Sequence, residues 1–178
     1  MMRTLPELDG VQYLEYADDV TLYVTGENEQ EVASRTQRAI NSFHEWTKLW
    51  GFQLNYNKTR AMKFTLKKQT HTKLVIGNKE IEFVKYHKYL GMTFDAPKLG
   101  WGPHIMQIKQ NTIKSTNIIR SISNANWGAD KIMLSRLYKM LVRSRIDYGS
   151  MFYDTAANKY LKKIDTTQNN CLRKILGV

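Results

Sequence analysis

The chain has 178 residues, enough to bury a hydrophobic core in one domain or in two small ones. Hydrophobic residues make up 42% and there are only 3 prolines, a globular composition that excludes a disordered chain. No apolar run approaches the roughly 18 residues that a membrane-spanning helix needs, and the single cysteine, Cys171, excludes an internal disulfide. The sequence therefore predicts a soluble, intracellular protein with no membrane partner.

Positive charge is concentrated in the C-terminal half. Residues 1–96 hold 13 Lys/Arg and 12 Asp/Glu, whereas residues 97–178 hold 14 Lys/Arg and 4 Asp/Glu. The C-terminal half therefore carries +10 of the total net charge of +11. Such an excess favours a polyanionic partner, because each neutralised phosphate releases condensed counterions. A solvated basic surface explains the charge equally well, so charge alone leaves both interpretations open.

The first predicted element is a hairpin. Two runs rich in β-branched and aromatic residues, Gln12–Tyr16 and Val20–Val24, flank Ala17, Asp18 and Asp19. Asp is common in turns, so the pair alone favours an acidic, solvated turn. Two adjacent carboxylates can also gather a divalent cation such as Mg²⁺, which prefers hard oxygen ligands.

A long amphipathic helix follows the hairpin. Its apolar stripe recurs at the helical period from Val32 to Trp50, which places Trp46 and Trp50 in the expected core. Asn28 and Glu31 resemble a capping box, and Gly51 stands where a glycine that ends a helix belongs.

The next segment favours short strands and the last favours helices. The spacing predicts strands at Phe52–Asn55, Ala61–Leu66 and His87–Phe94, and a hairpin around Gly77 and Asn78. After a boundary near Ala96–Gly102, the period becomes helical in three segments: Pro103–Ile122, Asp130–Ser144 and Asn158–Leu176.

Three short motifs carry a family resemblance. YADD (Tyr16–Asp19) resembles motif C of reverse transcriptases, GFQLNYNKTRAMKF (Gly51–Phe64) looks like motif D, and KYLGMTFD (Lys88–Asp95) looks like motif E, the primer-grip hairpin. LYKMLVRSRIDYGS (Leu137–Ser150) and QNNCLRKILG (Gln168–Gly177) are similar to the helices that follow the palm in Jockey and related elements. The chain thus resembles the reverse transcriptase of a non-LTR, LINE-type retrotransposon from motif C through the thumb.

The resemblance implies an α+β fold with two domains. Residues 1–96 would be part of a polymerase palm, made of antiparallel strands and one helix. Residues 97–178 would form a basic, all-α, three-helix thumb-like domain.

The resemblance also implies roles in catalysis. Asp18 matches the metal ligand of motif C, and Asp19 the second aspartate, with Mg²⁺ as the ion and Mn²⁺ as its alternative. Lys58 matches the motif D lysine, proposed to steady or protonate the leaving pyrophosphate. A plain turn lysine beside Asn57 is the other interpretation of Lys58.

Nucleic-acid contacts are implied at further positions. Tyr16 and Ala17 match positions under the primer terminus, and Tyr89, Leu90, Gly91 and Met92 match the primer grip. Strand core is the other interpretation of Leu90 and Met92, and the two interpretations are compatible. The basic helices add candidate phosphate contacts: Lys109, Lys114, Arg120, Lys139, Arg143 and Arg145. The implied partners are an RNA template, a DNA primer and deoxynucleoside triphosphates.

Motifs A and B do not occur in the sequence, although two-metal catalysis draws carboxylates from motif A as well as motif C. We therefore expect a fragment that polymerises only when the missing N-terminal half is supplied, and no template-directed synthesis by the isolated chain. Two alternatives stay open at this point: a non-catalytic nucleic-acid-binding module, and a decayed relic.

Overall fold

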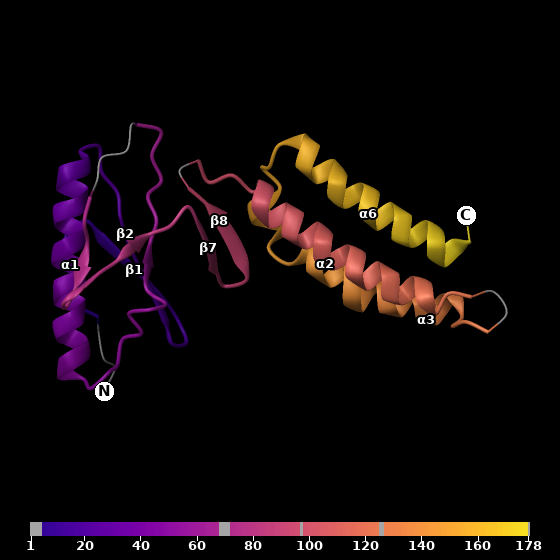
Figure 1. The fold of residues 1–178 in the computed structure, drawn as a ribbon, viewed down its shortest axis with the longest axis horizontal. Coiled ribbons are helices and arrows are strands. Elements are labelled where there is room, and N and C mark those ends of the chain that lie inside the picture. Colours follow the sequence, from indigo (N-terminus) through magenta and orange to yellow (C-terminus); the bar gives the residue numbers. More distant parts are fainter. Residues whose placement is uncertain (1–4, 68–71, 97, 125–126, 178) are drawn as a thin grey trace. The chain divides into compact units, whose positions relative to one another are not determined.

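The computed structural model describes residues 5–67, 72–96, 98–124 and 127–177 and divides the chain into two compact units (Figure 1). The first unit comprises residues 1–63 and 67–84, and the second comprises residues 64–66 and 85–178. The hairpin at residues 86–95 therefore groups with the helices, whereas the sequence prediction put the domain boundary after residue 96.

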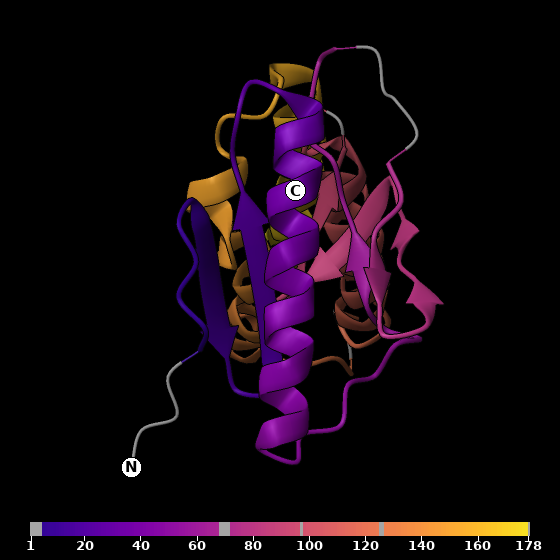
Figure 2. The ribbon, with the colours of Figure 1, turned by 90° about the vertical axis from the view of Figure 1, so that its left-hand side faces the viewer.

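In the first unit, a hairpin packs against one long helix. Strands β1 (Val11–Tyr16) and β2 (Asp19–Val24) pair antiparallel, with Tyr16 opposite Asp19. Helix α1 (Glu29–Leu49) covers one face of the hairpin, and Figure 2 looks directly onto this helix. The Tyr13 and Phe43 rings lie 6.4 Å apart. The predicted hairpin is confirmed.

Local capping explains where α1 begins and ends. The Asn28 side chain accepts a hydrogen bond from the backbone N–H of Gln30, and Gly51 adopts a φ of +74° just beyond the helix. Glu31 pairs with Arg35 on the next turn, so the reciprocal half of the predicted capping box is wrong. Trp50 is 41% exposed because it caps the helix C-terminus, which corrects its predicted place in the core.

The remaining strands of the first unit are short. β3 (Arg60–Ala61) pairs parallel with β6 (Glu82–Phe83), and β4 (Val75–Ile76) pairs with β5 (Lys79–Glu80) in the predicted hairpin around Gly77. No strand forms at Phe52–Asn55. The predicted strand Ala61–Leu66 ends after Ala61, and Leu66 is 82% exposed. Alternating residues stabilise a strand only when one face is buried, and that burial is missing there.

The second unit begins with a hairpin and continues as helices. Strands β7 (Tyr86–Tyr89) and β8 (Met92–Asp95) pair antiparallel, so the single strand expected at His87–Phe94 is wrong and the hairpin of the motif E resemblance forms instead. The helical elements are α2 (Gly102–Ser121), α3 (Lys131–Tyr138), the π-helical segment η1 (Lys139–Arg143), α4 (Ser144–Asp147), α5 (Ser150–Tyr153) and α6 (Asn158–Leu176).

Helix α2 is the centre of this unit and packs against both α6 and α3 (Figure 1). Ile105 and Ile119 on α2, Val142 on η1 and Cys171 on α6 are fully buried. Burial raises the pKa of the Cys171 thiol, which makes it a packing residue and a poor nucleophile. The mixture of helices and strands agrees with the predicted α+β class.

Among the described residues, no helix combines the length and the apolar composition that crossing a lipid bilayer requires.

Candidate metal-binding hairpin and nucleic-acid contacts

The two adjacent aspartates lie at the tip of the β1–β2 hairpin. Asp18 occupies the second position of a two-residue turn, and Asp19 is the first residue of β2. Both side chains are exposed. Tyr16, opposite Asp19, is 63% exposed, on the hairpin face that α1 does not cover.

The turn holds an alanine in a conformation that favours glycine. Ala17 has a φ of +54°, although the first position of a turn with positive φ is usually glycine. Such a backbone costs roughly 1–3 kcal/mol and is often found at functional sites. The strained residue directly precedes Asp18 in the turn.

The donor set at this tip fits part of a divalent-cation site. Within the described ranges, Asp18 and Asp19 have no ion pair, so both carboxylates are available as hard oxygen ligands. The described residues contain no group of three His, Cys, Asp or Glu side chains that could hold a metal. Two carboxylates with waters and substrate phosphates are a coordination set that Mg²⁺ accepts.

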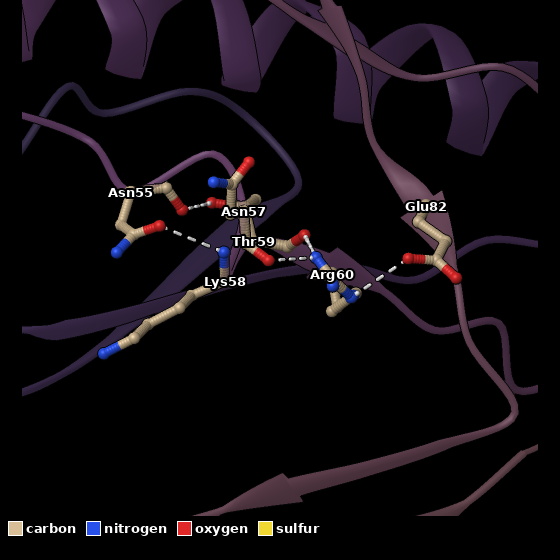
Figure 3. A network of polar contacts seen from close by, with 6 residues as sticks. All are labelled: Asn55, Asn57, Lys58, Thr59, Arg60 and Glu82. Atoms are coloured by element: carbon tan, nitrogen blue, oxygen red, sulfur yellow. Dashed lines mark hydrogen bonds and ion pairs between the residues drawn. The ribbon is translucent and has the colours of Figure 1, made fainter.

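The segment around Lys58 is a hydrogen-bonded turn (Figure 3). The backbone N–H of Lys58 donates to the Asn55 side-chain oxygen at 3.2 Å and to the Asn55 carbonyl at 3.1 Å. Its ammonium group extends away from this network and has no hydrogen bond or ion pair among the described residues. The turn thus fixes the Lys58 backbone and leaves its charge accessible.

Arg60 ties this turn to a neighbouring strand. Its guanidinium donates to the carbonyls of Asn57 and Thr59 at 2.6 and 2.8 Å, and it pairs with Glu82 on β6 at 3.3 Å (Figure 3). Hydrogen bonds of Asn55 before Lys58 and of Arg60 after it therefore fix the backbone of the turn that carries Lys58.

The motif E residues form the β7–β8 turn. Leu90 and Gly91 have φ values of +45° and +81°, the pair of positive angles that a type I′ hairpin turn requires. Tyr89 is half-buried, Leu90 is 37% exposed and Met92 is buried. Met92 therefore belongs to the core, as the alternative interpretation expected, while Leu90 reaches the surface.

Strand β8 is bound to α2 by two polar contacts. The Thr93 N–H donates to His104 Nδ1 at 3.2 Å, and the Thr93 hydroxyl donates to the Gln107 side-chain oxygen at 2.9 Å. Burial, and secondarily the charge of Lys88, lowers the pKa of His104. The imidazole is therefore neutral and able to accept this hydrogen bond.

The turn itself is held by Tyr148, which sequence reasoning missed. The Tyr148 hydroxyl donates to the Leu90 carbonyl at 2.7 Å. The two residues are 58 positions apart, and no local period or spacing marks the contact.

The six basic candidates fall into two groups. Arg143 pairs with Asp147 at 2.9 Å, and Arg145 donates to the Asn111 carbonyl and the Ser115 hydroxyl of α2. The other four have no ion pair in the part of the chain that the structure describes: Lys109, Lys114, Arg120 and Lys139. Among the six candidates, these four have charges that no ion pair among the described residues neutralises.

Comparison with known proteins adds independent information. A family model described as reverse transcriptase (RNA-dependent DNA polymerase) matches residues 1–94, a span that includes the first two motifs and the third as far as Phe94. The chain is 26% identical over 91% of its length to a probable RNA-directed DNA polymerase from transposon X-element of Drosophila melanogaster. It is 27% identical over 90% of its length to a probable RNA-directed DNA polymerase from transposon BS of the same organism.

A third relative is a retrovirus-related Pol polyprotein from type-1 retrotransposable element R1 4 of Nasonia vitripennis, 22% identical over 76% of the chain. The chain spans 18% of the length of each Drosophila relative and 39% of the Nasonia one. No solved structure gives a significant match. The resemblance to non-LTR retrotransposon polymerases is confirmed.

Proposed function

Because the chain belongs to the reverse transcriptase (RNA-dependent DNA polymerase) family, we propose that it supplies the motif C half of the polymerase metal site, the primer grip and a duplex-holding helical unit. The observation that carries this proposal is the position of Asp18 and Asp19. They lie at an exposed hairpin tip without ion pairs among the described residues, after a strained Ala17.

Each residue's role follows from its chemistry. Bound Mg²⁺ would activate the primer 3′-hydroxyl and neutralise charge on the leaving pyrophosphate. Asp18, supported by Asp19, would hold the ion, and Lys58 would bring a positive charge to the pyrophosphate from its braced turn. Tyr16 and Ala17 would lie beneath the primer terminus, and Tyr89–Met92 would position it.

The exposed carboxylate pair also supports the proposal that the chain does not polymerise by itself. Two-metal catalysis needs carboxylates from a further motif, and the described residues offer no third ligand. We propose that a further part of the polymerase, carrying that motif, would complete the site as a partner of these residues.

Cation binding tests the site directly. We expect Mn²⁺ to broaden the amide resonances of residues 16–20 in the purified chain, and Asp18→Asn to weaken this effect at least about tenfold. Glu15→Gln removes an exposed carboxylate from the same hairpin and is the matched control. Broadening that persists unchanged in Asp18→Asn contradicts the assignment.

Primer extension tests the proposal that the chain does not polymerise by itself. The purified chain should give no extension of a DNA primer on an RNA template in Mg²⁺. Extension by the chain that disappears in Asp18→Asn would contradict the proposed inactivity.

A second candidate function, nucleic-acid binding without catalysis, is favoured by the four candidate cations that have no ion pair among the described residues, Lys109, Lys114, Arg120 and Lys139. Each phosphate contact contributes about −0.9 to the slope of log K against log salt concentration on B-DNA. We expect Lys109→Ala, Lys114→Ala, Arg120→Ala and Lys139→Ala to reduce that slope for an RNA–DNA hybrid. Lys48→Ala, which removes a lysine paired with Glu45, serves as the control. Affinity that is insensitive to salt would contradict duplex binding.

A further inference from the structure

The chain makes a sharp bend between α4 and α5, and this bend lies against the turn of the β7–β8 hairpin. Tyr148 follows α4 in an extended conformation, with φ −63° and ψ 115°, and Gly149 then adopts a left-handed conformation with φ +69°. The bend therefore turns the backbone within two residues and places both of them beside the hairpin, within the second unit.

Both residues of the bend fit closely against the turn. The Tyr148 ring lies over Gly91, since a Cβ added to Gly91 would be 2.9 Å from the ring. A Cβ added to Gly149 would be 2.4 Å from the sulfur of Met92. The two glycines permit an approach that side chains would block.

The Tyr148 hydroxyl also satisfies a specific backbone group. It donates at 2.7 Å to the carbonyl of Leu90, the non-glycine residue that the turn holds at positive φ. A turn in this conformation is strained at Leu90, and the hydrogen bond favours the carbonyl direction that the turn needs.

We propose that Tyr148 is a positioning residue that fixes the primer-grip turn to the helical unit, so that the turn keeps its place when the helices hold a duplex. This inference rests on the proposed function, because it assigns a purpose to a contact between the proposed primer grip and the proposed duplex-holding helices. Tyr148 would act through Leu90 and Gly91, without touching the reacting atoms.

The test uses Tyr148→Phe, which removes the hydroxyl and keeps the ring over Gly91. Two quantities are measured on the full chain: amide hydrogen exchange in residues 86–95, and photocrosslinking of these residues to a thiothymidine at the 3′ end of the DNA strand of an RNA–DNA hybrid. We expect exchange to be faster and crosslinking weaker by about fivefold, the change expected from losing one neutral hydrogen bond.

Overall affinity separates positioning from general structural support. The affinity for the hybrid should stay within about twofold of the wild-type value, because the cations on α2 and η1 are unchanged. Tyr160→Phe is the matched control, since Tyr160 lies on α6 and its hydroxyl has no hydrogen bond to the hairpin among the described residues. It should leave exchange and crosslinking at their wild-type values.

Three outcomes overturn the inference. Exchange and crosslinking equal to wild type in Tyr148→Phe would show that the hydroxyl does not hold the turn. A loss of affinity as large as the loss of crosslinking would reduce Tyr148 to a packing role. A wild-type chain that does not bind the hybrid would refute the proposed binding function as well, whereas binding without an effect of Tyr148→Phe would refute the positioning role alone.

Discussion

The two motif-bearing hairpins of the chain share a loop length but differ in their surroundings. Both β1–β2 and β7–β8 have two-residue turns with a non-glycine residue at positive φ. The tip of β1–β2 is exposed, and its uncovered face carries Leu14, Tyr16 and Tyr23. The β7–β8 turn is held by Tyr148 and Gly149, and β8 is bound to α2. The β7–β8 hairpin therefore has its packing partners within this chain. The β1–β2 hairpin instead exposes two carboxylates at its tip and one uncovered face.

The largest expected effect on stability is at the contact between Gly149 and the β7–β8 hairpin. Gly149→Ala would combine a left-handed backbone with a Cβ 2.4 Å from the Met92 sulfur. We expect it to lower the free energy of unfolding of the second unit by about 2–4 kcal/mol in urea titrations. Gly51→Ala, measured on the unfolding of the first unit, is the control: its φ is +74° but nothing lies within 4 Å, so a loss of about 1 kcal/mol is expected. Equal effects of the two substitutions would contradict the close packing at Gly149.

A smaller effect is expected from protonation of His104. Its pKa is lowered in the folded protein, so the unfolded chain binds the proton more readily. The stability contribution is therefore complete above the unfolded pKa of about 6.5 and is lost as the pH falls below it. Urea titrations at pH values from about 7.5 down to about 5 should therefore show a decrease in the free energy of unfolding.

His104→Asn retains a side-chain acceptor near the Thr93 N–H and does not titrate. Its pH dependence over this window should be weaker than that of the wild-type chain. An identical pH dependence in the variant would show that another group is responsible.

A substitution in the turn of the β1–β2 hairpin should stabilise the first unit. Ala17→Gly places glycine at the position with a φ of +54°, so the free energy of unfolding of the first unit should rise by about 1 kcal/mol. Chemical denaturation monitored by the fluorescence of Trp46 on α1 and Trp50 at its C-terminal cap would measure it. A destabilised variant would mean that the turn is not strained at Ala17.

The smallest effect concerns the aspartates themselves. Both side chains are exposed and have no ion pair among the described residues, so Asp18→Asn and Asp19→Asn should change stability by less than about 0.5 kcal/mol. A thermal unfolding scan in the absence of divalent cations is sufficient. A large loss would indicate a structural role in place of the proposed metal role.

Sequence reasoning succeeded where local chemistry is enough to decide the structure. Helix α6 matches the predicted range at both ends, and α1 begins at the Asn28 cap that the sequence indicates. These features depend on residues within one turn of each other, so the pattern contains the information.

It failed where burial depends on distant partners. Met62, Phe64 and Leu66 alternate as in a strand, yet Phe64 and Leu66 are exposed because the β3–β6 pairing stops at Ala61. For the candidate site, the residue pattern placed YADD correctly on a hairpin, whereas only the family resemblance implied the hairpin at KYLG. The contacts that distinguish these hairpins, above all Tyr148 with Leu90, join residues far apart in sequence and leave no local signal.

The π-helical segment has a consequence for chain length. Leu134, Tyr138, Val142 and Ile146 are all buried and are spaced four residues apart. In a regular α-helix each such step overshoots one full rotation by about 40°, so the four would drift away from a common face. A π turn takes up one more residue than an α turn and cancels part of this drift.

The number of residues in the segment 139–143 therefore determines the rotation, about the helix axis, of the residues that follow it. Removing one residue there would regularise the helix and rotate the bend at Tyr148 by about 100°, away from the Leu90 carbonyl. Relatives that share this contact should vary freely in the exposed side chains of the segment while keeping its number of residues constant.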